Sequence, residues 1–332
     1  MTTKLNSSKV AAAERCHAVR RDVNPLITLL VPVFNEEESI DIFMETVSKI
    51  LGDAALSYEI LFVNDGSADN TLPKLLGYVN SKVTVVSLSR NFGKEAAITA
   101  GIDYANGDVV VPIDVDLQDP PEVIIEFVER WKEGYDIVYG LRSCRKSENL
   151  WKRLSARLFY KVINYFSHTN IPENVGDFRL LDRRVVEALR KLPERNRFMK
   201  GLFSWVGFRS TSVSYKRPER TGGLSKWNYW HLWNFAIDGI VGFSSIPLRV
   251  WGYVGLTVSI MSFIYGLFII IYTLYTGIKL PGYPSLMTVI LFLGGLQLFS
   301  IGIIGEYIGR LIVEIKGRPI YIVDSIYKQE KK

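Results

Sequence analysis

The sequence predicts an open, mainly parallel α/β sheet, followed by a helical hairpin that crosses a membrane. Three observations support this architecture. Short, continuous apolar runs alternate with amphipathic segments over the first two thirds of the chain, the pattern of buried parallel strands joined by helices. Polar clusters stand at the ends of these runs. Two segments near the C-terminus carry no charged residue, and each is long enough to span a bilayer, which takes about 20 apolar residues.

Strands and helices are expected in alternation from Pro25 onward. Leu26–Pro32 is a continuous apolar run that predicts a strand, and the amphipathic segment Glu37–Leu51 predicts a helix. The remaining expected strands are Tyr58–Val63, Val83–Leu88, Val109–Ile113, Ile137–Gly140 and Arg209–Lys216. One further helix is expected to begin near Asn70, and three more are expected at Lys94–Tyr104, Glu122–Lys132 and Asp182–Leu192. In sheets of this kind, ligands bind beyond the carboxyl ends of the strands.

The C-terminal third predicts a membrane anchor. Residues 226–249 are rich in Trp and Tyr, which favour the membrane interface, so we expect an interfacial amphipathic helix; a buried core helix is the alternative. Two spans follow, at about 250–276 and 286–308. The loop between them holds only Lys279, and other positive charges flank the hairpin at Lys226, Arg249, Arg310, Lys316 and Arg318. The positive-inside rule therefore places the N-terminal domain in the cytoplasm.

Composition and charge exclude several classes of protein. The chain has 332 residues and a formal net charge of +6, a mild basic excess that suits an anionic membrane or a phosphorylated substrate. No nucleic-acid-binding motif accompanies it, so no nucleic acid partner is expected. Cys16 and Cys144 lie in no CxxC or Cys/His cluster, which argues against zinc and a disulfide framework. Residues 1–24 lack the apolar core of a secretory signal and are expected to form a disordered arm.

An acidic cluster follows the expected strand Val109–Ile113. Asp114 and Asp116 come directly after it, and Gln118 and Asp119 stand just beyond. Two carboxylates at i and i+2 point to opposite faces of an ideal strand, but they can converge where a strand turns into a loop. Converging oxygens suit a hard cation that also binds phosphate oxygens. A DxD pattern alone is weak because solvated loops often contain one, and the preceding strand strengthens the interpretation.

A second candidate site follows the expected strand Tyr58–Val63. Asp65, in the turn Asn64–Ser67, would accept a hydrogen bond from a base or ribose; a plain Asp-Gly turn is the alternative. Glu36, after the first strand, would act similarly. Lys94 opens an expected helix, where an anionic phosphate is also favoured, so it is a candidate for binding a phosphate group.

Motifs in order along the chain resemble a known family. Four of them are Val31–Glu37, Asn64–Ser67, Ser89–Lys94 and Pro112–Pro121. Together they resemble the inverting family-2 glycosyltransferases of GT-A (Rossmann-like) fold, in the polyisoprenyl-phosphate branch that includes dolichol-phosphate mannose synthase. The hairpin and three further segments make the chain similar to the bacterial bactoprenol glucosyltransferases of O-antigen glucosylation: Val175–Leu180, Pro193–Gly201 and Gly305–Arg310. The resemblance covers about residues 25–322.

The resemblance implies a role for each matching position. The uridine would be held by Pro32, Glu36 and Asp65, and Mg²⁺ or Mn²⁺ with the diphosphate by Asp114 and Asp116, with Gln118 beside them. Arg142 would lie near the transferring phosphates, and Asp177 would occupy the catalytic position. Arg153 and Ser155 would bind the lipid phosphate. A mobile loop closing on the donor would contain Arg220 and Lys226.

The role of Asp177 has two interpretations. The resemblance places it where the family has a catalytic base. A phosphate monoester has a second pKa of about 6, so the acceptor is largely dianionic at neutral pH and needs little deprotonation. An orienting role for Asp177, toward the sugar or Arg179, is therefore the alternative. For Arg153, a solvated basic helix face is the alternative to phosphate binding.

The implied function is inverting transfer of glucose from UDP-glucose to undecaprenyl phosphate by a multi-pass protein of the cell inner membrane, with its catalytic domain in the cytoplasm. Expected partners are the UDP-sugar, the polyisoprenyl phosphate and membrane lipids. The resemblance also suggests a homo-oligomer, a flippase and a downstream glycosyltransferase. Alternatives are the same chemistry with galactose, N-acetylglucosamine, aminoarabinose or mannose, or a non-catalytic membrane scaffold or flippase component. A processive polysaccharide synthase is disfavoured because no Gln-x-x-Arg-Trp motif is present.

The expected domain organisation follows from these segments. It comprises the arm at 1–24, the catalytic domain at 25–225, juxtamembrane helices at 226–249, the transmembrane hairpin at 250–309 and a cytoplasmic tail at 310–332.

Overall fold

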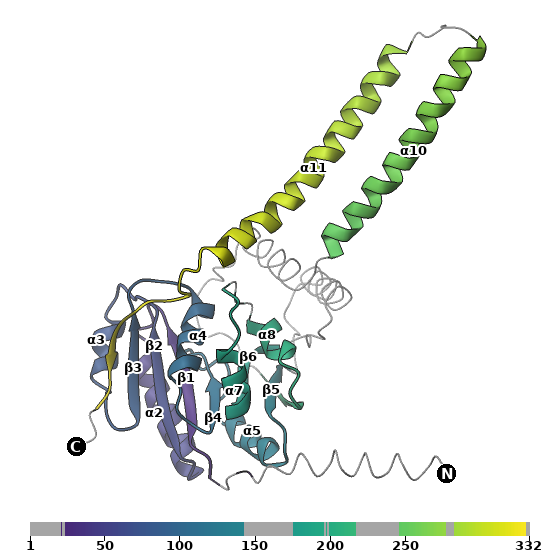
Figure 1. The fold of residues 1–332 in the computed structure, drawn as a ribbon. Helices are drawn as coiled ribbons and strands as arrows, with labels where there is room; N and C mark the ends of the chain where they lie inside the picture. The colour runs from purple at the N-terminus through teal and green to yellow at the C-terminus, as the bar shows by residue number, and fades with distance from the viewer. Residues whose placement is uncertain are drawn as a thin grey trace, which may run out of the picture. The chain divides into compact units, whose positions relative to one another are not determined.

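The computed structural model describes residues 21, 24–142, 175–195, 197, 199–216, 246–276 and 282–329. The chain divides into two units, which are described separately. One unit contains the sheet with its helices and the C-terminal strand, and the other contains a pair of long helices (Figure 1). The predicted interfacial helix at 226–249 lies almost entirely outside the described residues.

A sheet of eight described strands forms the first unit, in the order β7-β5-β6-β4-β1-β2-β3-β8. Its core is apolar, and the side chains of Leu29, Val31 and Phe62 are fully buried in it. The strands are β1 Ile27–Val33, β2 Tyr58–Asn64, β3 Val83–Leu88, β4 Val109–Pro112, β5 Ile137–Arg142, β6 Val175–Asp182, β7 Ser210–Tyr215 and β8 Val323–Tyr327. The strand segments predicted from apolar runs are therefore confirmed, with small shifts of their ends.

The sheet is mixed. β1 pairs in parallel with β2 and β4, β2 with β3, and β5 with β7. β6 runs antiparallel between β4 and β5, and β8 runs antiparallel to β3. Val33 at the end of β1 lies opposite Asn64 at the end of β2. The predicted parallel arrangement therefore holds for the centre of the sheet, and its polar strand ends share one edge.

Six described helices accompany this sheet: α2 Ile40–Asp53, α3 Thr71–Leu76, α4 Lys94–Tyr104, α5 Val123–Lys132, α7 Arg183–Arg190 and α8 Met199–Trp205. α2 is amphipathic and buries Ile40, Phe43 and Val47, which recur at helical spacing. α4 approaches β1 closely, since a Cβ on Gly101 would lie 2.4 Å from Leu30 Cγ. That close packing sets the position of Lys94, the first residue of α4.

The C-terminal segment returns to the sheet as β8. Leu88 of β3 pairs with Val323, and the Ser89 N–H donates to the Ile322 carbonyl at 3.0 Å. The Tyr321 hydroxyl donates to Asp103 Oδ2 at 2.8 Å. Figure 1 shows β8 beside β3 at the edge of the sheet. Residues 310–332 were expected to form only a tail, because a five-residue edge strand has too little local pattern to reveal its distant partner.

Arg21 is anchored although it lies in the segment expected to be a disordered arm. Its guanidinium pairs with Asp136 Oδ1 at 2.6 Å, and its side chain is only 5% exposed. The guanidinium carbon also lies 4.9 Å from the centre of the Trp131 ring. Contacts of this kind to a buried carboxylate and an aromatic face fix the chain just before β1.

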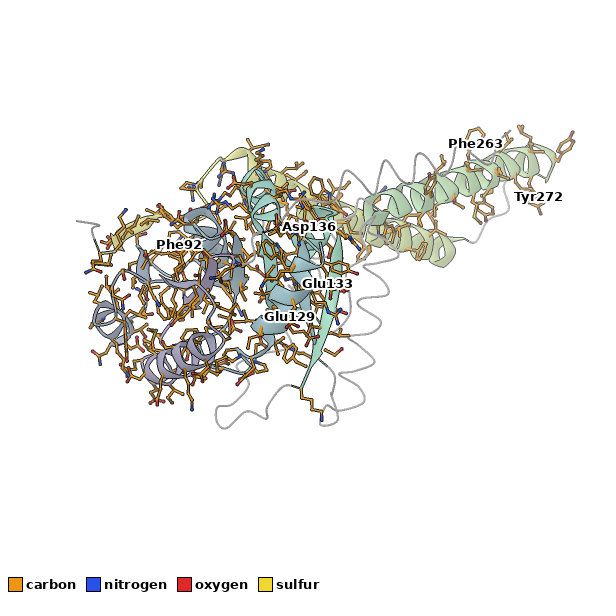
Figure 2. All side chains as sticks on the ribbon, turned by 90° about the horizontal axis from the view of Figure 1, so that it is seen from below. Phe92, Glu129, Glu133, Asp136, Phe263 and Tyr272 are labelled. Carbon is orange, nitrogen blue, oxygen red and sulfur yellow. The ribbon has the colours of Figure 1, made fainter. Side chains whose placement is uncertain are left out.

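The second unit is a helical hairpin. Its helices are α10 Ile246–Thr276 and α11 Tyr283–Ile315, and the ring centres of Trp251 and Phe299 lie 4.8 Å apart between them. Phe263 and Tyr272 project from α10 (Figure 2) and are 74% and 54% exposed. The predicted two-helix hairpin is therefore present. Among the described residues, no helix is both long and apolar enough to cross a membrane.

Candidate active site

Six of the predicted donor-site residues line one pocket in the first unit. The pocket has a volume of about 280 Å³, and its lining includes Pro32, Glu36, Asp65, Lys94, Asp114 and Asp116. These residues lie at or beyond the carboxyl ends of β1, β2 and β4, or at the start of α4. Because β1 is the parallel neighbour of both β2 and β4, these ends meet at one edge, where ligands of such sheets bind.

Asp65 organises the loop that follows β3. Its Oδ1 accepts from the Phe92 N–H at 2.7 Å, and its Oδ2 accepts from the Gly93 N–H at 2.9 Å. Burial raises the pKa of Asp65, and the two backbone hydrogen bonds oppose that rise. The carboxylate therefore fixes Ser89–Lys94 against the end of β2, a structural task beyond the ligand contact predicted from the sequence.

Gly66 allows this loop to approach closely. Its φ is +65°, and a Cβ there would lie 2.4 Å from the Arg90 carbonyl carbon. The neighbouring Asn64 side chain donates to Ser87 Oγ at 3.0 Å and accepts from the Ser67 N–H at 3.2 Å. The turn Asn64–Ser67 therefore connects the end of β2 to β3 and the loop after it. Asn64 supplies side-chain hydrogen bonds, and Gly66 permits the positive φ and the close approach.

The loop after β1 is tied to the turn after β2. Asn35 has a φ of 54°, and its N–H donates to Ser67 Oγ at 3.0 Å. The Glu36 N–H donates to Thr71 Oγ1 at 2.9 Å, and Glu36 Oε2 accepts from the Ser39 hydroxyl at 3.0 Å. These contacts hold the backbone of Glu36 at the pocket. The Glu36 carboxylate can still accept hydrogen bonds from further donors.

Lys94 joins Asp114, just beyond the end of β4, to Asp177 of β6. Its Nζ lies 2.6 Å from Asp114 Oδ1 and 3.3 Å from Asp177 Oδ2. Burial alone would lower the pKa of Lys94, but the two carboxylates outweigh burial and raise it. The ammonium is therefore charged at neutral pH and bridges Asp114 of the DxD motif and Asp177.

Asp177 is an ionised carboxylate in a partly buried setting. Its side chain is 20% exposed, and Oδ1 has no hydrogen-bond partner among the described residues. Burial raises the pKa of Asp177, but the charges of Lys94, Lys200 and Arg179 outweigh burial and lower it. A carboxylate with a lowered pKa is a weak base at neutral pH, which favours the orienting interpretation of Asp177.

A buried charge cluster lies behind Asp177. The Arg179 guanidinium donates to the Gly176 carbonyl at 2.6 Å, and burial lowers the pKa of Arg179 to about 10. Glu95 Oε2 accepts from the Met199 N–H at 3.4 Å. Burial, assisted by the Asp177 charge, raises the pKa of Glu95 to about 7. Glu95 therefore titrates near neutral pH beside the site.

Arg142 lies at the end of β5 among polar partners. Its Nε donates to the Tyr215 hydroxyl at 3.3 Å, and its Nη2 lies 3.6 Å from Asp119 Oδ1. The Tyr215 hydroxyl in turn donates to Asp119 Oδ1. Burial opposes the charge of Arg142, but Tyr215 and the Asp119 and Asp114 carboxylates raise its pKa. Arg142 is therefore a fixed cation within electrostatic range of the DxD motif.

The DxD loop could hold a divalent cation together with a ligand. Asp116 is exposed, its Oδ1 accepts from the Gln118 N–H at 3.1 Å, and Leu117 turns the loop with a φ of 54°. No group of three or more acidic, His or Cys side chains among the described residues could hold a metal alone. Two carboxylates suffice for Mg²⁺ or Mn²⁺ when phosphates and waters complete the coordination, so Asp114 and Asp116 fit that metal class.

Four predicted residues lie outside the described parts of the chain. They are the predicted lipid-phosphate residues and the predicted mobile-loop residues: Arg153, Ser155, Arg220 and Lys226.

Several residues around the site were not among those predicted from the sequence. Glu95 and Lys200 contribute to the charge around Asp177, and Asp119 and Tyr215 contact Arg142. Asp119 had a local signal, since it stands in the acidic cluster after β4. Glu95 directly follows Lys94, whereas Lys200 and Tyr215 come from distant segments that no local pattern connects to the pocket.

The chain matches two family models. Residues 28–190 match the model described as glycosyl transferase family 2, and residues 246–311 match the GtrB C-terminal hairpin. The first match covers most of the sheet unit, and the second covers most of α10 and α11.

Curated relatives are similar over nearly the full chain. The SfII prophage-derived bactoprenol glucosyl transferase of Shigella flexneri is 52% identical over 304 residues, which cover 91% of this chain and 98% of the relative. A prophage bactoprenol glucosyl transferase homolog of Escherichia coli K12 is 50% identical over 304 residues, covering 91% and 99%. An uncharacterized glycosyltransferase of Synechocystis is 51% identical over 306 residues, covering 92% and 96%.

Proposed function

This chain belongs to glycosyl transferase family 2 and is a glycosyltransferase, and from that premise we propose that it transfers glucose from UDP-glucose to undecaprenyl phosphate with inversion. The observation that carries the proposal is the convergence of the nucleotide-site and DxD residues on one pocket. The similarity to bactoprenol glucosyl transferases supplies the sugar and the lipid. The same residues would serve another UDP-sugar, so the identity of the donor requires a direct measurement.

The nucleotide would occupy the part of the pocket lined by Pro32, Glu36 and Asp65. Carboxylates accept hydrogen bonds from the ring N–H of uracil and from ribose hydroxyls. Asp65 already accepts two backbone N–H groups, so its position is fixed before the donor arrives. Such preorganisation lowers the entropic cost of binding.

The diphosphate would lie over the DxD loop, near a metal ion and two cationic side chains. Asp114 and Asp116 would hold Mg²⁺ or Mn²⁺, and that ion, when bound, neutralises charge on the departing diphosphate. Lys94 lines the same pocket, and Arg142 is held at the end of β5. Both side chains would supply positive charge where the leaving group develops negative charge, which is the most general way to lower such a barrier.

The acceptor would react as the phosphate dianion. Its oxygen attacks the anomeric carbon, the bond to UDP breaks, and the linkage inverts, so an α-linked donor gives a β-linked lipid phosphosugar. Asp177, whose pKa is lowered, would orient the sugar rather than remove a proton. Arg153 and Ser155 would bind the lipid phosphate, and Arg220 and Lys226 would belong to a loop that closes over the donor.

We propose further that the hairpin anchors the enzyme in the cell inner membrane, with the catalytic unit in the cytoplasm. Val250–Thr276 and Leu286–Gly305 carry no charged residue, and large apolar side chains along α10 and α11 are exposed. β7 precedes the hairpin, β8 follows it, and both belong to one sheet. Any crossing of the membrane between them must therefore be even in number. The aromatic segment 226–249 would lie at the interface.

The transfer reaction tests the proposed function. The protein in detergent is incubated with undecaprenyl phosphate, Mn²⁺ or Mg²⁺, and radiolabelled UDP-glucose, and label is measured in the organic phase. We expect label that survives mild base but not mild acid. Label with a different UDP-sugar would keep the reaction and change the donor. If the folded protein transferred sugar from none of the donors, the proposed function would be wrong.

Accessibility of single cysteines tests the membrane arrangement. In a variant without Cys16 and Cys144, cysteine is introduced at Lys279 in the hairpin loop or at Asp324 in β8. An impermeant maleimide applied to intact cells should label Lys279→Cys and spare Asp324→Cys. Labelling of both positions, or of Asp324→Cys alone, would contradict the proposed orientation.

A further inference from the structure

Arg142, Tyr215 and Asp119 form a polar network beside the DxD loop. Asp119 and Tyr215 are 3% and 5% exposed, whereas the Arg142 side chain keeps 25% of its surface in solvent. Two buried polar groups therefore hold one accessible cation. Such groups cost free energy to bury unless they are paired, so this arrangement calls for a physical explanation.

The sheet builds the network by strand register. β5 and β7 are parallel neighbours, and Arg142 pairs directly with Tyr215 at their carboxyl ends. Two glycines provide the space. A Cβ on Gly176 of β6 would lie 2.8 Å from Arg142 Nη2, and a Cβ on Gly140 would lie 2.6 Å from Tyr215 Cε1. Neither the guanidinium nor the phenol ring could occupy its place beside a larger residue.

The hydrogen bonds of the network have one consistent arrangement of protons. Tyr215 has a single hydroxyl proton, which it donates to Asp119, and its oxygen accepts from Arg142 Nε. Burial and the Asp119 charge raise the pKa of Tyr215 to about 12, so the phenol stays protonated through the physiological range. The network therefore has a fixed polarity from Arg142 through Tyr215 to Asp119.

Asp119 also belongs to the DxD loop. It stands three residues after Asp116, and the loop between them is turned by Leu117 and closed by the hydrogen bond from the Gln118 N–H to Asp116. The network thus connects the loop that carries the DxD carboxylates to the end of β5 that carries Arg142. A ligand held by both would meet carboxylates and a cation at a constant spacing.

We propose that Asp119 and Tyr215 are positioning residues that hold the Arg142 guanidinium against the diphosphate of the nucleotide-sugar donor. This inference rests on the proposed function and extends it to two residues that do not themselves touch the donor. Tyr215 and Asp119 use the Nε edge of Arg142, and a planar guanidinium with five donors retains others for a phosphate.

A double-mutant cycle separates positioning from a purely structural role. The variants are Tyr215→Phe, Arg142→Gln and the double variant, in the full chain in detergent. Tyr215→Phe keeps the ring, whose centre lies 5.8 Å from that of Phe178. The matched control is Tyr78→Phe, which removes a hydroxyl bonded to Asp41 at 2.7 Å outside the pocket lining. UDP affinity by calorimetry, kcat and KM for UDP-glucose, and the unfolding midpoint are measured.

If Tyr215 positions Arg142, the loss of kcat and UDP affinity in Tyr215→Phe should depend on the presence of Arg142. Tyr215→Phe should reduce both kcat and UDP affinity by about tenfold, the value of one hydrogen bond to a charged group. Arg142→Gln should cost kcat about 100-fold, and adding Tyr215→Phe to it should change neither quantity more than about twofold. Tyr78→Phe should leave both unchanged. If Tyr215→Phe does not fold, Asp119→Asn takes its place in the same cycle.

Two results would overturn the inference. One is an equal loss from Tyr215→Phe with and without Arg142, which would mean a structural role. The other is no loss of UDP affinity or kcat in Tyr215→Phe or in Arg142→Gln. If the wild type binds UDP but transfers no sugar to undecaprenyl phosphate, the proposed function fails, and the same cycle measured on UDP affinity still decides whether Tyr215 acts through Arg142.

Discussion

Lys94 Nζ contacts both carboxylate oxygens of Asp114, at 2.6 and 2.8 Å. Asp114 is the first carboxylate of the DxD motif, so the ammonium lies where a divalent cation would bind the same oxygens. Lys94 also reaches Asp177, and its side chain is 45% exposed, which leaves it room to move. A donor diphosphate would attract the ammonium and free Asp114 for the metal.

The first prediction concerns Lys94→Met. Removing the ammonium should tighten Mn²⁺ binding in the absence of nucleotide by about tenfold, because the competing cation is lost. Sugar transfer should fall about 100-fold, since a cation at the leaving group is lost. Free Mn²⁺ is measured by electron paramagnetic resonance. The matched control is Lys74→Met, whose ammonium pairs with Asp41 at 2.7 Å elsewhere. Unchanged or weaker Mn²⁺ binding in Lys94→Met would contradict the exchange of cations.

The second prediction concerns Asp116→Ala. Asp116 is exposed, so its replacement should change stability by less than about 0.5 kcal/mol. Transfer should nevertheless fall by about 100- to 1,000-fold, because one of the two metal carboxylates is gone. Asp53→Ala, at the end of α2, controls for the loss of a surface carboxylate. If Asp116→Ala transferred sugar at the wild-type rate and still required a metal, Asp116 would not be a metal ligand.

The pocket residues could be predicted from the sequence because their signals are local. A buried strand followed at once by a polar residue places Asp65 or Asp114 at the carboxyl edge of the sheet without knowledge of distant pairings. The contact between Lys94 and Asp177 could not be predicted in this way. It depends on β6 lying beside β4, and that order is set by packing across the whole sheet.

The same limit applies to the Arg142 network and to β8. Arg142 was placed near the phosphates by resemblance, but its partner Tyr215 follows from the register of β5 and β7. β8 pairs with β3 across more than 200 residues, and Tyr321, just before β8, donates to Asp103 of α4 over a similar separation. Edge strands carry weak alternation, so their pairing is specified by the surface they meet rather than by their own sequence.

The third prediction concerns Gly66→Ala. An alanine at a φ of +65° is strained, and its Cβ would overlap the Arg90 backbone, which cannot rotate away as a side chain can. We expect a loss of about 3 kcal/mol, which lowers the unfolding midpoint of a domain this size by about 6–12 °C. Gly52→Ala is the matched control, with no atom within 4 Å of the added Cβ. It should stabilise α2 by roughly 0.5 kcal/mol. Equal midpoints for the two variants would contradict the close approach at Gly66.

The fourth prediction concerns the pH dependence of stability at Glu95. Its pKa is about 7 in the folded protein, raised from 4.5. The folded state therefore binds this proton more tightly than the unfolded state does. The contribution of Glu95 to the free energy of unfolding is fully present below pH 4.5 and is lost as the pH rises through about 7. The Asp177 pKa is lowered from 3.8, so the contribution of Asp177 is lost only at more acidic pH.

Comparison of unfolding midpoints at several pH values checks this window. The midpoint of the wild type relative to Glu95→Gln should fall between pH 4.5 and about 7 and level off above it. Glu129→Gln, which removes an exposed carboxylate of α5 labelled in Figure 2, is the control for the loss of one surface negative charge. A constant difference between the wild type and Glu95→Gln would mean that Glu95 titrates outside the window.

The fifth prediction concerns the C-terminal strand. β8 pairs with β3 directly before the loop Ser89–Lys94, and the Ile322 carbonyl accepts from the Ser89 N–H. That loop supplies the two N–H groups that Asp65 accepts. Truncation after Pro319 should therefore loosen the loop, accelerate hydrogen exchange at the Phe92 and Gly93 amides, and weaken UDP binding about fivefold.

Truncation after Lys328 is the matched control, because it shortens the chain and leaves β8 in place. Its amide exchange and UDP affinity should equal those of the full chain. A general loss of stability in the shorter protein would accelerate exchange throughout the sheet, including β1, whereas loosening of the loop accelerates it selectively beyond β3. Unchanged exchange at Phe92 and Gly93 after loss of β8 would show that Asp65 alone holds the loop, and that the return of the chain after the hairpin does not support the nucleotide site.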